Sequence, residues 1–263
     1  MLRATYFESE GLKETDFRSV VTHVTQRNNR VLDTLLANGL ITSADAEARR
    51  VNVNAGYSDR SSDGYEFSLT ANPAKGWRIR ANYSITDAIE DNIIPEVVAW
   101  AGDAIAYWET FDPNLITTGT TTLQKEVTDL RDYLDDQTYV EGRAARGNRK
   151  HKMTIFTHYE FQQGVLKGLS LGGGFRYQGE RLAGRNQATG ELFWGDPTTR
   201  WDASASYGFS LFRNRVRGSL QLNVFNVTDD RDPLASRYDA TGRLTRYEIP
   251  APRTWRLSST FRF

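Results

Sequence analysis

Eight segments of the chain alternate apolar and polar side chains with a period of two, which is the pattern of a β-strand whose faces meet different surroundings. In the last of them, Trp255, Leu257 and Phe261 share one face, while arginine, serine and threonine fill the other. The alternation predicts strands at residues 2–6, 65–71, 77–85, 153–161, 169–177, 201–211, 216–224 and 255–263. We therefore predict an all-β protein built from antiparallel hairpins.

The connections between these strands alternate between short and long. The short ones follow Ala71, Phe161 and Leu211, and the long ones follow Tyr6, Thr86, Tyr177 and Asn226. Such alternation is typical of outer-membrane barrels, which have short periplasmic turns and long extracellular loops. Apolar spacing near 3.6 predicts helices over Asn28–Leu40 and Ile89–Trp108, inside two of the long loops.

The apolar face suits lipid better than a protein core. From Trp77 onward its central stretches carry no charged residue, and a lysine or arginine facing lipid at mid-depth would cost about 2–4 kcal/mol. Small residues such as Gly173 and Ala203 would fill a sandwich core poorly but are harmless against lipid. We predict an antiparallel transmembrane β-barrel. Its predicted lipid-facing residues are Trp77, Ile79, Tyr83, Leu220, Leu222, Trp255, Leu257 and Phe261.

Composition excludes several other classes of protein. No apolar run is long enough for a membrane helix, and 33 basic and 33 acidic residues balance, so nothing draws the chain to nucleic acid. The three histidines, His23, His151 and His158, are scattered, cysteine is absent, and no nucleophile, phosphate-binding or dinucleotide motif occurs. We expect no enzyme activity, no metal and no cofactor.

Four segments together resemble the barrels of TonB-dependent outer-membrane receptors. The segments are Gly64–Pro73, Gly76–Tyr83, the glycine-rich Lys167–Gly179, and the Asn-Val-Phe-Asn-Val-Thr-Asp run within Leu222–Asp229. The resemblance implies that residues 1–263 form about eight C-terminal strands of a 22-stranded barrel, with short helices in long extracellular loops. The family's plug domain and TonB box are absent from the chain, whose first residues read as the middle of a strand. We expect a C-terminal fragment or a truncated gene product.

The resemblance also implies a function and partners. The family takes up scarce nutrients such as ferric siderophores, cobalamin or oligosaccharides across the outer membrane of Gram-negative bacteria, powered by TonB through the missing N-terminal part. The remaining expected partners are membrane lipid, lipopolysaccharide, and the barrel-assembly machinery, for which Phe263 would be the signal. The nutrient itself is not readable from this sequence.

Candidate ligand contacts lie where an upper-lumen ligand would touch the wall: Arg176, Gln178, Arg181 and Trp194. A basic run of Arg143, Arg146, Arg149 and Lys150 leaves two interpretations open, a contact to lipopolysaccharide phosphates or another anion, and an ordinary solvated charge run. Two alternatives to the receptor also stay open. One is a self-standing eight-stranded outer-membrane barrel, and the other is a soluble carbohydrate-binding β-sandwich.

Overall fold

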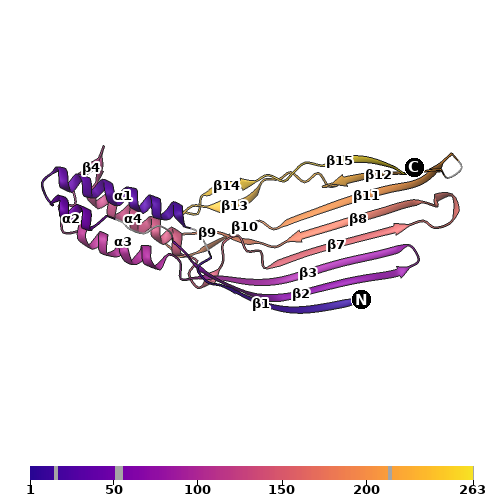
Figure 1. The fold of residues 1–263 in the computed structure, drawn as a ribbon, viewed down its shortest axis with the longest axis horizontal. Helices are drawn as coiled ribbons and strands as arrows, with labels where there is room; N and C mark the ends of the chain where they lie inside the picture. Colours follow the sequence, from indigo (N-terminus) through magenta and orange to yellow (C-terminus); the bar gives the residue numbers. More distant parts are fainter. Residues whose placement is uncertain (15–16, 51–55, 213–214, 263) are drawn as a thin grey trace. The chain divides into compact units, whose positions relative to one another are not determined.

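The computed structural model describes residues 1–14, 17–50, 56–212 and 215–262 (Figure 1). It divides into two compact units. A sheet unit comprises Met1–Ser9, Ser62–Ala88 and Arg146–Phe263, and a helical unit comprises Glu10–Ser61 and Ile89–Ala145. Phe263, the predicted assembly signal, lies outside the described residues. Of the helices in the described ranges, none is both long and apolar enough to cross a membrane.

The eight predicted strands are confirmed as the eight long strands of one sheet. They pair in the order in which they occur in the chain, and every long-strand pair with a resolved register is antiparallel. The short strand β6 (Arg143–Ala144) also pairs with β3. The long strands are β1 (Leu2–Gly11), β2 (Asp59–Ala74), β3 (Trp77–Asp91), β7 (His151–Glu160), β8 (Leu169–Gln178), β11 (Thr198–Leu211), β12 (Val216–Phe225) and β15 (Thr254–Arg262).

The sheet is open in this chain. β1 and β15 stand at the two ends of the strand order and do not pair with each other within the described residues. A self-standing eight-stranded barrel would require that pairing, because closure is what removes the edges of a barrel sheet. A β-sandwich would divide the strands between two sheets, whereas all the long strands belong to one. Both alternatives to the receptor barrel are therefore wrong.

The register keeps the predicted apolar positions together on one face. Residues directly opposite each other in an antiparallel pair point to the same side of the sheet. One row of directly opposite residues crosses the sheet on the apolar face. Every predicted lipid-facing residue either belongs to this row or is two, four or six positions along its strand from a member of it, and so lies on the same face. The row from β3 to β15 consists of Trp77, Tyr159, Leu171, Ala205, Leu222 and Leu257.

Aromatic residues border this apolar face at two levels. On three strands two aromatic residues stand six positions apart, which spans about 20 Å along an extended strand. These pairs are Trp77 and Tyr83, Trp201 and Tyr207, and Trp255 and Phe261. Aliphatic and small residues lie between the two levels. This spacing is close to the apolar band with flanking aromatic girdles that outer-membrane barrels present to lipid.

The helical unit contains both predicted helices, with shifted limits. The prediction at Asn28–Leu40 corresponds to α1 (Arg18–Ala37), which begins ten residues earlier. The prediction at Ile89–Trp108 corresponds to α3 (Pro95–Trp108), because residues 89–91 continue β3 and Pro95 opens the helix. Sequence reasoning missed α2 (Ser43–Ala48), α4 (Leu123–Thr138), β4 (Ile116–Thr118) and β5 (Thr121–Thr122).

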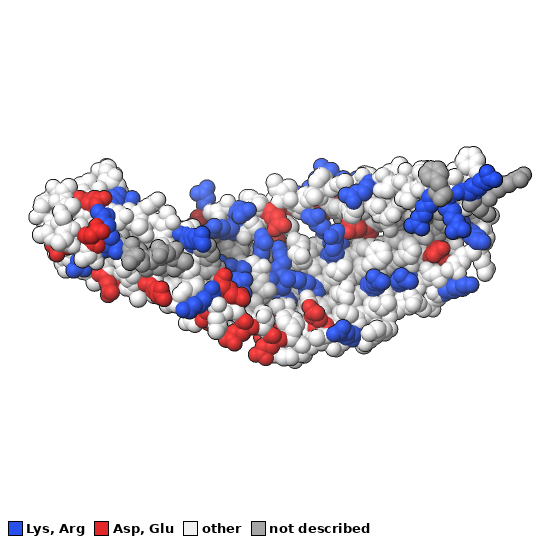
Figure 2. Space-filling model, viewed as in Figure 1, with Lys and Arg blue, Asp and Glu red and all other residues white. Residues whose placement is uncertain are grey.

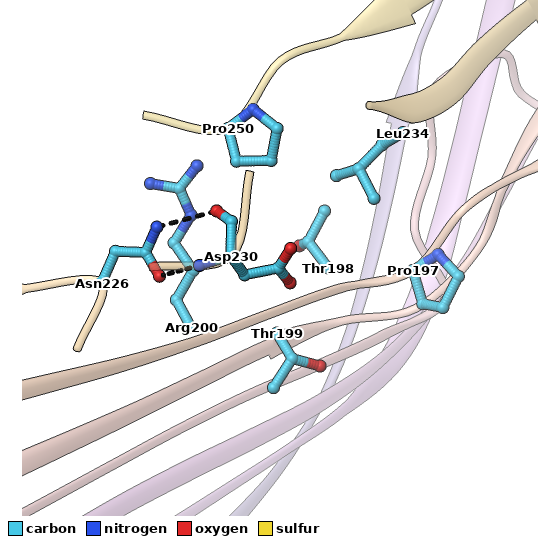
Figure 3. A pocket seen from close by; sticks show the side chains of 8 residues that line it. All are labelled: Pro197, Thr198, Thr199, Arg200, Asn226, Asp230, Leu234 and Pro250. Atoms are coloured by element: carbon cyan, nitrogen blue, oxygen red, sulfur yellow. Dashed lines mark hydrogen bonds between the residues drawn. The ribbon is translucent and has the colours of Figure 1, made fainter. Parts of the chain in front are cut away.

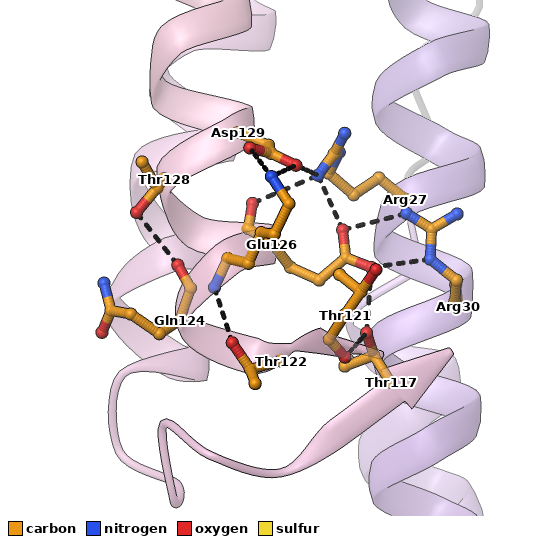
Figure 4. Close-up of polar contacts among 10 residues, drawn as sticks. Arg27, Arg30, Thr117, Thr121, Thr122, Gln124, Glu126, Thr128 and Asp129 are labelled. Carbon is orange, nitrogen blue, oxygen red and sulfur yellow. Dashed lines mark hydrogen bonds and ion pairs between the residues drawn. The ribbon is translucent and has the colours of Figure 1, made fainter. Parts of the chain in front are cut away.

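A buried carboxylate joins α1 to α4 (Figure 4). The Glu126 side chain is fully buried. Its carboxylate accepts hydrogen bonds from Arg27 Nη1 at 2.6 Å, Arg30 Nε at 2.7 Å and Thr117 Oγ1 at 3.0 Å. Burial alone would raise the pKa of Glu126. The hydrogen bonds from Arg30 and Thr117 and the two guanidinium charges outweigh burial, and the pKa is lowered instead. Glu126 is therefore a charged group that is paired with two guanidinium groups and one hydroxyl among the buried side chains of the helical unit.

The lipid-facing assignment can be tested at neighbouring residues of β15. In the membrane-inserted protein, Leu257→Arg places a guanidinium in the apolar band, at a cost of about 2–4 kcal/mol, and we expect loss of assembled barrel. Ser258→Arg is the matched control on the opposite face and should assemble normally. Heat-modifiable mobility of outer-membrane fractions on gels measures both. Equal behaviour of the two variants would contradict the assignment.

The Glu126 cluster predicts a second, local effect. Glu126→Gln leaves two partly buried guanidinium groups without their carboxylate, which should destabilise the helical unit by about 3–5 kcal/mol. Glu109→Gln is the control, because its pair with Arg131 is exposed and contributes about 0–1 kcal/mol. Hydrogen exchange should increase in α1 and α4 in the first variant only. Unchanged protection in Glu126→Gln would show that the carboxylate is not what joins the helices.

Candidate ligand-binding region at the loop ends of the strands

Two of the predicted ligand contacts, Arg176 and Gln178, lie on the polar face of β8 near its loop end. Arg176 Nη2 is 2.5 Å from Asp202 Oδ2 on β11, and its guanidinium stays half exposed. The other oxygen of Asp202 accepts the backbone N–H of Asn226 at 3.1 Å. Asp202 therefore orients Arg176 and fixes the end of β12 at the same time.

Two hairpins that the sequence did not reveal rise from the loops beside these strands. They are β9 (Arg181–Arg185) with β10 (Leu192–Gly195), and β13 (Leu234–Tyr238) with β14 (Leu244–Glu248). Asp196 joins them, since its backbone N–H donates to Ala235 O at 3.1 Å and its carboxylate accepts from Ala235 N at 2.7 Å. A Cβ on Gly184 would stand 2.8 Å from Tyr238 O, so the hairpins approach closely only because this residue is glycine.

The other two predicted contacts, Arg181 and Trp194, belong to the first of these hairpins. Arg181 Nη2 pairs with Glu248 Oε2 of the second hairpin at 3.0 Å, so it connects the two hairpins. Trp194 lies opposite Leu182 in the first hairpin and is 46% exposed. Two of the four predicted residues thus lie on the polar face of the sheet and two lie in the first hairpin.

Arg149 has a role that sequence reasoning missed. The solvated-run interpretation does not hold for it, because it is buried and gives Nη1 to the carbonyl oxygens of Gly179 and, at 3.0 Å, Asp196. Burial, followed by the nearby charge of Arg181, lowers the pKa of Arg149. Its guanidinium holds the start of the first hairpin against the segment that follows that hairpin.

Asn226, the second asparagine of the motif, closes the loop after β12 (Figure 3). Its Nδ2 donates to the carbonyls of Asp230 and Ala251, each at 2.9 Å, and its Oδ1 accepts from Asp230 N at 3.2 Å. Its φ of 53° is in the left-handed region, where asparagine is better tolerated than most residues. The adjoining cavity, about 30 Å³, has room for roughly one water. It is lined by Pro197, Thr198, Thr199, Arg200, Asn226, Asp230, Leu234 and Pro250.

The polar face supplies two further cations at this end of the sheet. Arg200 lies directly opposite Arg176, and Arg256 lies over the Phe225 ring at 5.6 Å from its centroid. Their presence on the polar face follows from strand parity, but the place of Arg200 opposite Arg176 depends on the register between β8 and β11. In the described part of the chain, no group of three or more histidine, aspartate or glutamate side chains is placed to hold a metal ion.

The chain belongs to the family of TonB-dependent receptor-like β-barrels. The model of that family, described as "TonB dependent receptor-like, beta-barrel", matches residues 15–227, which is well over half of the chain. The chain is thus part of an outer-membrane β-barrel of a Gram-negative bacterium. No curated protein matches it in sequence.

One solved structure with a similar fold is a receptor of the outer membrane. The ferripyoverdine receptor of Pseudomonas aeruginosa, bound to ferripyoverdine, has 16% identity and a TM-score of 0.50, with 99% of this chain and 24% of the receptor covered. The ferric preacinetobactin receptor of Acinetobacter baumannii has 16% identity and a TM-score of 0.45, with 80% and 23% covered. The chain therefore spans about a quarter of the length of these receptors.

The role of Asn226 can be tested with a variant that removes its side-chain hydrogen bonds but keeps its backbone conformation. Asn226→Gly keeps the positive φ at no steric cost but removes the side-chain bonds, so we expect destabilisation of residues 226–253 by about 1–3 kcal/mol. Asn223→Ala, on the polar face of β12, is the control. Limited proteolysis and hydrogen exchange measure the loop. If the loop is equally protected from proteolysis and hydrogen exchange in the two variants, its closure does not depend on Asn226.

Proposed function

We propose that the chain is the C-terminal part of the barrel of a TonB-dependent receptor that takes up a scarce nutrient. The observation that carries this proposal is the match of residues 15–227 to the family's barrel model. It is supported by the two-faced sheet, whose apolar side has the character of a lipid surface and whose polar side has that of a lumen wall.

Among ferric siderophores, cobalamin and oligosaccharides, the polar face favours the ferric siderophores. Arg176, Arg200 and Arg256 bring three guanidinium groups to the loop end of the wall, and guanidinium groups suit ligands that carry carboxylate or other anionic oxygens. Arg176, Gln178, Arg181 and Trp194 are the proposed ligand contacts. Of these, Trp194 offers an exposed aromatic face and Arg176 a half-exposed cation.

The remaining partners are proposed on family membership. TonB would act through the part of the receptor that precedes these strands, lipopolysaccharide and lipid would surround the apolar face, and the barrel-assembly machinery would read Phe263. In this arrangement the long loops, including the helical unit, face the cell exterior. The short turns face the periplasm.

Growth of the source bacterium under nutrient limitation tests the proposal. Deletion of the full-length gene should abolish growth on one class of ferric siderophore, and deletion of tonB should have the same effect. In the complemented strain, Arg176→Gln with Arg200→Gln should raise the half-saturating siderophore concentration about tenfold, whereas Ser258→Gln on the same face should not. Uptake that persists without TonB would overturn the proposal.

A further inference from the structure

One face of α1 forms a wide polar groove with β4 in the helical unit. The groove extends over about three turns of the helix, from Gln26 to the C-cap residue Asn38, which is about 18 Å at the helical rise. Its volume of about 620 Å³ is in the usual range for a site that holds a small ligand. It is lined by Gln26, Asn29, Arg30, Asp33, Thr34, Ala37, Asn38 and Thr117. All of these except Ala37 are polar, so the groove offers almost no apolar surface.

The two charged side chains of the groove already have partners of opposite charge. Arg30 donates Nε at 2.7 Å and Nη2 at 2.9 Å to the buried carboxylate of Glu126 (Figure 4). Asp33 accepts a hydrogen bond from Arg50 Nη2 at 2.9 Å. Neither charge therefore calls for an ionic ligand. The Arg30 side chain is still partly exposed, and a guanidinium has further N–H groups to donate.

Asn29 carries an amide that the protein does not satisfy. Its side chain is partly buried, and within the described residues its Oδ1 is buried without a hydrogen-bond partner. An unpaired buried acceptor is costly, so the amide gains a hydrogen bond by rotating toward a donor in the groove. The amides of Gln26 and Asn38 line the same wall. Each amide both donates and accepts, which is what a ligand with hydroxyl groups requires.

The charge of the helical unit narrows the choice of ligand. Its ranges, Glu10–Ser61 and Ile89–Ala145, contain 19 acidic and 10 basic residues, so the unit carries nine net negative charges. In Figure 2, by contrast, lysine and arginine predominate on the visible face over the strands. The negative field of the helical unit disfavours phosphate groups, nucleic acid and other polyanions. The polar lining disfavours lipid, so the groove suits an uncharged ligand rich in hydroxyl groups.

We propose that this groove is a binding site for an uncharged glycan. The amides of Gln26, Asn29 and Asn38 hydrogen-bond the sugar hydroxyls, and Arg30 donates to one of them. The groove lies wholly within the helical unit, so the inference goes beyond the proposed uptake and does not depend on it. The glycan is held at the groove and is not the transported nutrient. Its source is either the cell's own lipopolysaccharide or the surroundings, and the chemistry at the site is the same for both.

Binding of immobilised glycans to the purified full-length receptor tests this proposal. The probes are an array of neutral oligosaccharides with their sulfated counterparts, and the O-polysaccharide released from the source strain's own lipopolysaccharide. We expect binding to neutral glycans and none to sulfated ones. Binding to the O-polysaccharide alone assigns the groove to the cell's own surface, and binding to array glycans alone assigns it to an external source. Binding to no neutral glycan, or a preference for sulfated ones, would overturn the proposal.

Variants of the groove locate the binding. Gln26→Ala with Asn29→Ala removes two amides and leaves the Glu126 cluster in place, so the half-saturating glycan concentration should rise about tenfold. Ala37→Tyr fills the groove without removing any of these hydrogen bonds and should have the same effect. Gln124→Ala is the matched control, because it removes an exposed amide of α4 outside the groove, and it should bind normally.

Equal binding by the groove variants and the control would show that the glycan is held elsewhere. Hydrogen exchange of α1 should be the same in all of them, which separates a lost contact from a lost fold. Growth on the ferric siderophore should not change in the groove variants. Failure of this proposal and failure of the proposed uptake are therefore distinguishable.

Discussion

The hydrogen bonding of the strand backbone is the constraint on which the rest of the structure depends. In a hydrocarbon layer an unpaired N–H or C=O group has no water to bond, so each costs several kcal/mol. Within the described ranges, six of the eight long strands have a partner on both sides, while β1 and β15 each have one unpaired edge. Both edges therefore need neighbouring strands in the membrane. This requirement supports the proposal that the sheet is one sector of a larger barrel.

Pairing also fixes which residues share a face. A slip of one residue between β12 and β15 would turn Arg256 and Arg262 toward the apolar side and Leu257 toward the polar one. At about 2–4 kcal/mol for each buried guanidinium, such a register is strongly disfavoured. The apolar face can tolerate small residues such as Ala205 and Gly218, because fluid lipid needs no close packing. It cannot tolerate charge, so charged residues are missing from alternate positions of each strand, and this pattern can be recognised in the sequence.

This pattern explains how much of the fold could be predicted from the sequence. The period of two predicts all eight long strands and their faces, since each strand's pattern is local. The hairpins β9–β10 and β13–β14 depend on contacts between loops far apart in the chain, such as Asp196 with Ala235, and no local pattern indicates them. α4 is different, since Leu123, Val127, Leu130 and Leu134 have helical spacing and could have been recognised. Arg149 and Asn226 look like ordinary surface polar residues until their carbonyl partners are known.

The same charged side chains meet three different environments in this chain. In the helical unit, Glu126 is buried and accepts hydrogen bonds from Arg27, Arg30 and Thr117. At the loop ends, Arg149 is buried against carbonyl oxygens and serves as a brace. On the polar face, Arg78 and Arg80 are exposed and lie beside the half-exposed Phe156. In the first two arrangements the charged groups have hydrogen-bond partners within the chain, so their role is structural. The exposed guanidinium groups of the third are open to a partner outside these strands. The polar face is therefore where the proposed uptake function of this chain should be sought.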